Sequence, residues 1–264
     1  MRETLAALLV VFTVASAGAA APDVKALVTK MKAALEPSKA GARRLTLTLS
    51  QQGETTQVTI GEARKNLGNS GRILLAVLPP APVGAAGTAY LVQEGGPGQD
   101  TEWFYLPYVR RVRKLVSPEA YSAFLNSDFT YADLGFVDTG ATYTFLGEGT
   151  EGGKKTYKIQ AVPKQTWYYS RWVTTIDAET SMPIMREIYD PANQLWKRQR
   201  WEPSTVVDGV TVPSAVSMED VQAKSRSDIR MTGADFDVSL PDTLFDPDQL
   251  PAAAAAPVWA TVGK

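Results

Sequence analysis

Most of the sequence alternates between apolar and polar residues, and this pattern constrains the fold more than any other feature. Leu45, Leu47 and Leu49, for example, alternate with two threonines and a serine. Residues of the same parity on a strand share one face of a sheet. About eleven or twelve such segments follow one another, separated by turns such as 190–193 and 207–210. The sequence therefore predicts a mainly β chain with a single large curved antiparallel sheet, dry on one face and wet on the other.

Helical spacing is confined to short stretches. One helix is predicted between Asp23 and Pro37, where Val24, Leu27, Val28, Met31 and Leu35 form one apolar stripe. A second is expected to start at Ser117-Pro118-Glu119, and a third short piece covers residues 128–134. This is little helical material for so large an apolar face. The sheet is therefore expected either to leave a hydrophobic hollow or to close into a barrel filled by its own side chains.

The first residues have the features of a secretory signal peptide. A charged start is followed by the apolar run 5–14 and the small-residue zone 15–21, with cleavage expected near Ala19. The apolar run is too short to cross a bilayer, which takes about 20 residues. We therefore expect a soluble periplasmic protein with a signal peptide at 1–21, one domain at 22–250 and a flexible C-terminal tail at 251–264.

Two residue types are absent, and their absence excludes whole classes of function. The chain has no cysteine, so it has no disulfide, no thiolate site and no lipid anchor of the bacterial lipoprotein kind. It also has no histidine, which excludes Ser-His-Asp catalysis and imidazole metal ligands. With 27 basic and 28 acidic residues, nothing indicates a nucleic-acid partner. No catalytic residue, metal or cofactor is predicted.

An enzyme without histidine or cysteine could use only carboxylates, Lys, Tyr, Ser or Arg. Asp128 paired with Glu119 or Asp133 is the first pair that a glycosidase hypothesis would test. Their placement by a predicted helical turn favours a structural role, such as the capping of a helix by Asp. A calcium site would need more converging carboxylates than Asp128 and Asp133 supply. We therefore expect the chain not to be an enzyme.

Two segments carry further information. Residues 103–113 (WFYLPYVRRVR) run from aromatics into a strand that places Arg111 and Arg113 opposite Val112. The structural interpretation is a hairpin corner with a solvated basic edge, and the functional one is a basic rim that meets lipid headgroups. Residues 126–134 (NSDFTYADL) are expected to cap a turn through Ser127 or Asp128 while the aromatic side chains point inward.

These two segments resemble motifs of the LolA-like family of periplasmic outer membrane lipoprotein-sorting proteins. Members carry W-x-Y-L-P-x-x-R-R-V-R shortly before S-D-F-T-Y-x-D-L, which this chain matches at 103–113 and 127–134. It departs at Asn126, where relatives often have a small residue, and at Ala132, where they often have an acidic one. The likeness extends loosely from the N-terminal helix to Leu244-Phe245-Asp246.

The resemblance implies a more specific fold and function than the pattern alone. LolA-like proteins form an unclosed half-barrel of about eleven antiparallel strands capped by helices, whose interior shelters acyl chains in the periplasm. The chain also resembles a subgroup associated with RND-type lipid exporters. The implied partners are the acyl chains of a lipid or lipoprotein, an RND-type inner-membrane exporter and an outer-membrane acceptor, and a monomer is expected.

The predicted binding residues follow from the dry strand faces and the two motifs. Lipid contacts are assigned to Leu45, Leu47, Leu49, Val58, Ile60, Trp103, Tyr105, Phe124, Leu125 and Phe129. Headgroup or partner contacts are assigned to Arg110, Arg111 and Arg113, and the segment around Phe124, Leu125 and Phe129 is expected to act as a moving lid. The alternative is an envelope assembly protein that docks through an exposed sheet edge or an aromatic patch, with Trp167, Trp172, Trp196 or Trp201 as its tryptophans.

Overall fold

The computed structural model describes residues 22–67, 70–95, 100–115, 121–134, 140–164, 166 and 168–262. Three predictions lie outside these residues: the signal peptide at 1–21, the helix start at Ser117-Pro118-Glu119, and the placement of Trp167. None of the helices in the described ranges has the length and apolarity needed to cross a bilayer.

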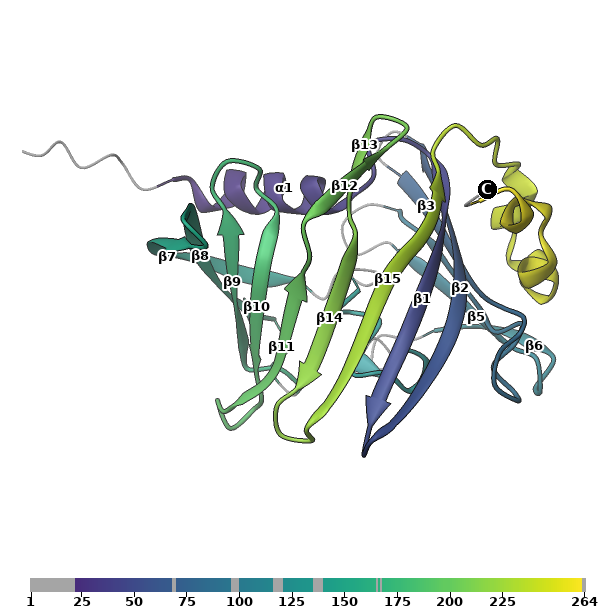
Figure 1. Cartoon of the computed structure of the whole chain (residues 1–264), viewed down its shortest axis with the longest axis horizontal. Coiled ribbons are helices and arrows are strands. Elements are labelled where there is room, and N and C mark those ends of the chain that lie inside the picture. Colours follow the sequence, from purple (N-terminus) through teal and green to yellow (C-terminus); the bar gives the residue numbers. More distant parts are fainter. Residues whose placement is uncertain are drawn as a thin grey trace, which may run out of the picture.

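One antiparallel sheet of thirteen strands dominates the described part of the chain (Figure 1). Its order is β6-β5-β4-β3-β2-β1-β15-β14-β11-β10-β9-β8-β7, so β6 and β7 are free edges and the sheet does not close into a barrel. The strands are β1 (Gly41–Gln51), β2 (Glu54–Leu67), β3 (Ser70–Leu78), β4 (Ala89–Gln93), β5 (Thr101–Leu106), β6 (Arg111–Lys114), β7 (Ala141–Glu151), β8 (Lys154–Pro163), β9 (Arg171–Asp177), β10 (Pro183–Tyr189), β11 (Leu195–Trp201), β14 (Ala215–Asp220) and β15 (Ser225–Asp235).

The predicted single, curved and unclosed antiparallel sheet is confirmed, with thirteen strands in place of about eleven. The segment between β11 and β14 leaves the sheet as a separate hairpin of β12 (Ser204–Val207) and β13 (Val210–Pro213). Its two-residue turn has positive φ at both Asp208 and Gly209, the geometry that Asp-Gly favours.

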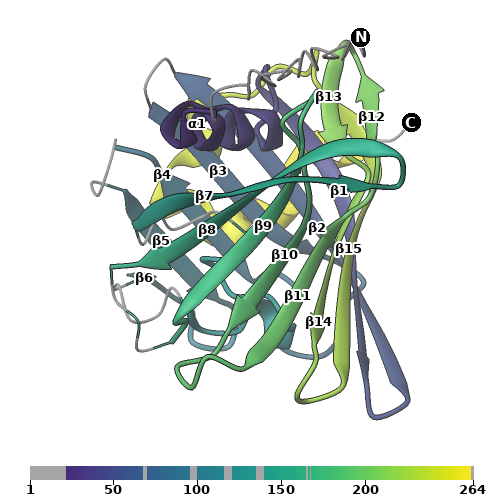
Figure 2. The ribbon, with the colours of Figure 1, turned by 90° about the vertical axis from the view of Figure 1, so that its left-hand side faces the viewer.

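Helix α1 (Val24–Leu35) lies across one end of the curved sheet (Figure 2). The Asp23 side chain accepts a hydrogen bond from the Lys25 backbone N–H at 2.9 Å, and the helix ends at Glu36 before Pro37, as the sequence predicts. Leu27, Val28 and Met31 are buried against Ile159 of β8 and Ile176 of β9. The apolar stripe therefore covers the half of the sheet that ends at β7.

The concave face over β1–β4 is covered by residues 121–134, which we call the cap segment. It contains one 3-10 turn, η2 (Phe124–Asn126), and the backbone of Ala123 bridges to Thr130. Residues 131–134 form turns, so the helix predicted for 128–134 is wrong. Phe129 and Tyr131 are buried in the same cluster as the apolar side chains of β1–β4, which confirms that the aromatics of this segment point inward.

The convex face of the same strands is covered by the C-terminal segment, residues 240–262. It consists of the 3-10 helices η3 (Asp242–Phe245), η4 (Pro247–Ala255) and η5 (Pro257–Ala260), and lies outside β1–β5 in Figure 1. Phe245, Leu250, Trp259 and Val262 are buried there. The expectation of a flexible tail from residue 251 is therefore wrong, because its apolar residues pack on an apolar sheet face.

Candidate ligand-binding cavity

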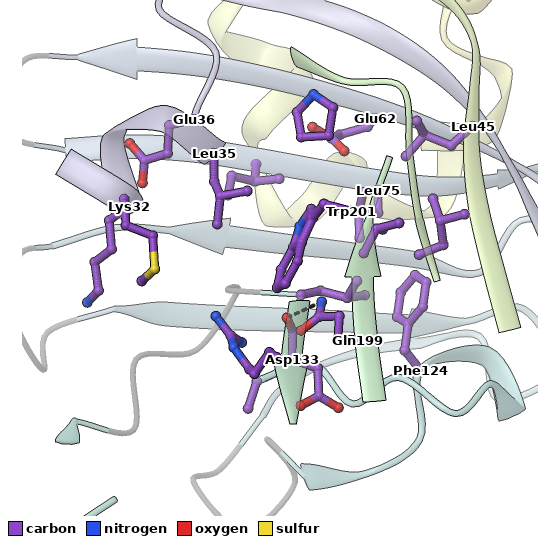
Figure 3. Close-up of a pocket in the computed structure, with 18 of the residues that line it drawn as sticks. Lys32, Leu35, Glu36, Leu45, Glu62, Leu75, Phe124, Asp133, Gln199 and Trp201 are labelled. Carbon is purple, nitrogen blue, oxygen red and sulfur yellow. Dashed lines mark hydrogen bonds between the residues drawn. The ribbon is translucent and has the colours of Figure 1, made fainter. Parts of the chain in front are cut away.

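A cavity of about 510 Å³ lies on the concave side of the sheet, between α1, the cap segment and the two halves of the sheet. In the close-up, Leu45, Leu75 and Phe124 line one side, facing Trp201 and Gln199, with Leu35 of α1 nearby (Figure 3). The apolar side chains that line the cavity include Met31, Leu35, Leu45, Ile60, Ile73, Leu75, Tyr121, Phe124, Trp172, Ile188, Trp201, Val216, Ile229 and Met231. Much of the cavity wall is therefore apolar.

The end of the cavity next to α1 is charged, and its charges are paired. Arg43 of β1 forms an ion pair and a hydrogen bond with Glu62, its cross-strand partner on β2. Arg64 lies 3.3 Å from Glu94 and 3.4 Å from Glu36. Burial raises the pKa of Glu94, against the lowering effect of Arg64. These groups balance one another, as partly buried charges must.

The opposite wall presents a polar row across neighbouring strands. Thr174 of β9, Arg186 of β10 and Gln199 of β11 are cross-strand partners in consecutive ladders. Arg186 donates from Nε to the Thr174 hydroxyl at 3.4 Å, and its guanidinium lies 5.3 Å from the centre of the Trp201 ring. Burial lowers the pKa of Arg186. The wall therefore combines a cation, an amide and an indole facing one apolar space.

Buried hydrogen bonds fix the cap segment to the sheet. The Asp128 carboxylate accepts from Ser225 at 2.5 Å and from Ser227 at 2.6 Å, and Lys197 donates to the Asp128 carbonyl at 2.6 Å. The Asp133 carboxylate accepts from the Tyr169 hydroxyl at 3.0 Å. Both carboxylates are therefore engaged in hydrogen bonds within the protein. Among the described residues, no cluster of three or more metal-ligating side chains occurs.

The structure places the predicted apolar residues in three different environments. Leu45, Ile60 and Phe124 line the cavity. Leu47, Val58 and Phe129 belong to the buried cluster around it, and Leu49 and Leu125 pack against that cluster. All eight therefore lie on the concave side, although only three reach the cavity.

The assignment of Trp103 and Tyr105 to the lipid site is wrong. Both pack on the convex face, against the cluster formed with the C-terminal segment. Phe104, which lies between them on β5, packs on the concave cluster instead. Alternation placed the two residues correctly on one face, but it did not tell which face is concave.

The three predicted arginines lie at an exposed corner. Arg110 has a positive φ in the turn between β5 and β6, Arg111 and Arg113 follow on the edge strand β6, and all three are exposed. Next to them Tyr108 and Val109 are exposed to 73% and 50%. The corner does not line the cavity, so these arginines are separate from the apolar site.

Sequence reasoning missed the wall formed by β9–β11. Trp172, Ile188 and Trp201 line the cavity together with Arg186 and Gln199. The alternation of apolar and polar residues along each strand could have placed these side chains on one face of the sheet. That this face lies opposite β1–β3 across the cavity depends on the curvature of the whole sheet. Trp172 and Trp201 face the cavity and Trp196 packs on the concave cluster, so these three do not form an outer aromatic patch.

Comparison with known proteins first places the chain in a family. The family model described as "-like: Uncharacterized protein" matches residues 75–252. The chain belongs to this family. Comparison with curated protein sequences gave no match.

Solved structures identify the fold as LolA-like. One similar structure is described as an outer membrane lipoprotein-sorting protein domain from Vibrio parahaemolyticus, with a TM-score of 0.75 and 19% identity over 86% of this chain and 97% of that one. A DUF1329 family protein from Desulfovibrio piger has a TM-score of 0.75 and 24% identity over 86% and 98% of the two chains. A LolA superfamily protein from Nitrosomonas europaea has a TM-score of 0.66 and 17% identity over 86% and 99%.

These likenesses confirm, at the level of the fold, the LolA-like resemblance drawn from residues 103–113 and 127–134. The match covers 86% of this chain and nearly the full length of each neighbour. Identities below a quarter leave cargo and partners to be argued from this chain's own residues.

Proposed function

We propose that this protein is a periplasmic carrier that binds acyl chains of a lipid or lipoprotein in the concave cavity and moves them toward the outer membrane. The observation that carries the proposal is the cavity of about 510 Å³, which is lined by many apolar side chains and lies between the two halves of an unclosed sheet. An ordinary core would fill this space with side chains.

The size and lining of the cavity suit a reversible carrier. Ligand pockets commonly enclose about 300–1,000 Å³ and have apolar walls with a few placed polar groups. Each methylene that leaves water contributes about 0.8 kcal/mol, so one acyl chain binds well even when only part of it is sheltered. A carrier must also release its cargo, and a cavity open to one side allows a chain to enter and leave.

The proposal also includes where the carrier acts and which partners it meets. The expected signal peptide at 1–21 and the sorting role printed for the Vibrio parahaemolyticus structure support action between the two bacterial membranes. We assign an RND-type inner-membrane exporter as the donor and an outer-membrane component as the acceptor. The exposed corner with Arg110, Arg111 and Arg113 is proposed to contact headgroups or a partner during transfer.

Binding without chemistry is part of the proposal. Asp128 and Asp133, the first carboxylate pair that a glycosidase hypothesis would test within the described residues, are engaged in holding the cap segment. We therefore expect the carrier to take up and release its cargo unchanged.

The test is to recover the protein from a bacterial periplasm and identify co-purified molecules by native mass spectrometry. Binding of a fluorescent fatty acid to the delipidated protein gives an independent measure. Bound lipids and saturable fatty-acid binding support the carrier. A lipid-free protein that binds no fatty acid overturns it and favours an envelope assembly protein acting through the exposed corner.

A further inference from the structure

The arginines that line the cavity differ in how their charges are balanced. Arg43 is paired with Glu62, and Arg64 is paired with Glu36 and Glu94. Arg186 has no carboxylate partner at ion-pair distance among the described residues. Its one hydrogen bond runs from Nε to Thr174, which leaves both terminal nitrogens of the guanidinium without a protein acceptor there.

The surroundings of Arg186 hold its guanidinium in place without neutralising it. The side chain rises from the concave face of β10 and lies beside the Trp201 indole, at 5.3 Å from the ring centre. Asp133, Tyr143 and Tyr169 act on it only at longer range, and the Asp133 carboxylate is already bound to the Tyr169 hydroxyl and the Thr130 backbone N–H. Burial lowers the pKa of Arg186, against the raising effects of Asp133, Tyr143 and Tyr169.

An unmatched acceptor lies on the next strand. Gln199 is Arg186's cross-strand partner on β11 and is 2% exposed. Its amide nitrogen donates to the Asp133 carbonyl at 3.4 Å, while its side-chain oxygen has no hydrogen-bond partner. A buried orphan acceptor beside an unpaired guanidinium costs free energy unless another molecule supplies the missing groups.

We propose that Arg186 binds the oxyanion of an anionic amphiphile, a carboxylate or phosphate at the end of an acyl chain, inside the cavity. This inference rests on the proposed carrier function and narrows its cargo to molecules with an anionic end. The planar guanidinium offers two parallel N–H donors that match a carboxylate or phosphate. The apolar residues on the facing wall, among them Leu45 and Leu75, then receive the hydrocarbon chain.

The charge of Arg186 sets a preference among acyl-chain ligands. A neutral ester or amide offers no negative charge to Arg186, so an acyl chain in that form leaves the guanidinium unpaired. The site is thus built for a free anionic lipid more than for an acyl group attached through an ester or amide.

The experiment compares three ligands with the same hydrocarbon chain. Hexadecanoate, monohexadecyl phosphate and the neutral methyl hexadecanoate compete with the uncharged dye Nile red for the delipidated full-length protein, at mildly alkaline pH where the carboxylate is ionised. We expect the two anions to bind about tenfold or more tightly than the methyl ester, the size of effect typical of hydrogen bonds to charged groups. The ratio between the two anions tells which headgroup the site prefers.

Variants locate the preference. Arg186→Met is expected to abolish the preference for the two anions over methyl hexadecanoate, and Arg186→Lys to retain part of it, since lysine keeps the charge but lacks the planar fork. Arg200→Met is the matched control, because Arg200 is exposed and lies on the outward face of neighbouring β11.

Each outcome separates the two proposals. Equal binding of anions and ester by the unaltered protein, or a preference that survives Arg186→Met, overturns the anion site and leaves the carrier standing. Failure of all three ligands to displace Nile red overturns both. The ratio measured on the unaltered protein decides the inference even where a variant folds poorly.

Discussion

The two faces of strands β1–β5 are both apolar, yet one is filled and the other is hollow. On the convex face the C-terminal segment packs directly on the sheet and buries Trp259 and Val262. On the concave face the cap segment and the far half of the sheet enclose a cavity of about 510 Å³. One face therefore receives a permanent cover from its own chain, and the other keeps room for a separate molecule.

The sizes of the side chains account for this difference. Beside Leu74, Leu78 and Leu91, the convex face carries small residues, namely Ala42, Gly61, Ala63, Ala76 and Ala89, while the concave face carries larger ones such as Leu45, Ile60, Leu75 and Tyr90. A Cβ built on Gly61 would lie 2.7 Å from the ring of Trp259, so the close approach requires glycine there. Small residues let a covering segment pack tightly, whereas large ones hold it away.

The largest expected effect is on the filled face. Trp259→Ala should lower the free energy of unfolding by about 3–5 kcal/mol, because a buried tryptophan in a tightly packed cover leaves a cavity that cannot collapse. The matched variant is Trp201→Ala, which removes the same side chain from the hollow face at a cost below about 2 kcal/mol. Urea denaturation measures both, and equal losses would contradict the distinction between the faces.

A smaller effect is expected from overpacking the same contact. Gly61→Ala should destabilise the protein by about 1–3 kcal/mol, because the added methyl group meets the Trp259 ring. The control is the same substitution in a Trp259→Ala background, where the clash no longer exists and the cost should largely disappear. If the losses in free energy of unfolding were additive in this double-mutant cycle, contact with the Trp259 ring would not be the reason for glycine at position 61.

Filling the hollow face should affect binding more than stability. Val216 of β14 lines the cavity and is half-buried, so Val216→Phe has room for its ring and should change the free energy of unfolding by less than about 1 kcal/mol. Displacing two methylenes of a bound chain should weaken fatty-acid affinity by roughly tenfold. Val206→Phe, at an exposed position of the β12–β13 hairpin, should leave affinity unchanged.

The smallest effect concerns pH and a carboxyl group on the concave side of β5. Burial raises the pKa of Glu102 from 4.5 to about 7, with a further contribution from Asp100 and against the lowering effect of Tyr90. The folded chain thus holds this proton more tightly than the unfolded chain, so this contribution to stability is present below pH 4.5 and is lost as pH rises to about 7. Urea denaturation at both ends of this range should show a weaker pH dependence for Glu102→Gln, and an identical dependence would contradict the assignment.

The features that are set by residues adjacent in the sequence were predictable. Asp23 and Pro37 bracket α1, Asp208-Gly209 forms the tight hairpin turn, and the alternation of Leu45 and Leu47 places both on one face. The roles of Arg186 and Gln199 could not be predicted from the sequence. They depend on both side chains lining the cavity and on the Arg186 guanidinium having no carboxylate partner there among the described residues. The packing of residues 251–262 on the sheet was also not predictable, because an alanine-rich run has no strong pattern of its own and becomes ordered against a complementary surface.

The sequence by itself determined that Trp103 and Tyr105 share one face of a strand and that Phe104 lies on the other. Only the tertiary structure decided which face is convex, because a period of two sorts residues into two sets without assigning either set to a partner. That assignment comes from the curvature of thirteen strands and from the C-terminal segment, which lies more than a hundred residues further along the chain. The same long-range curvature brings β1–β3 opposite β9–β11 and leaves the apolar hollow between them.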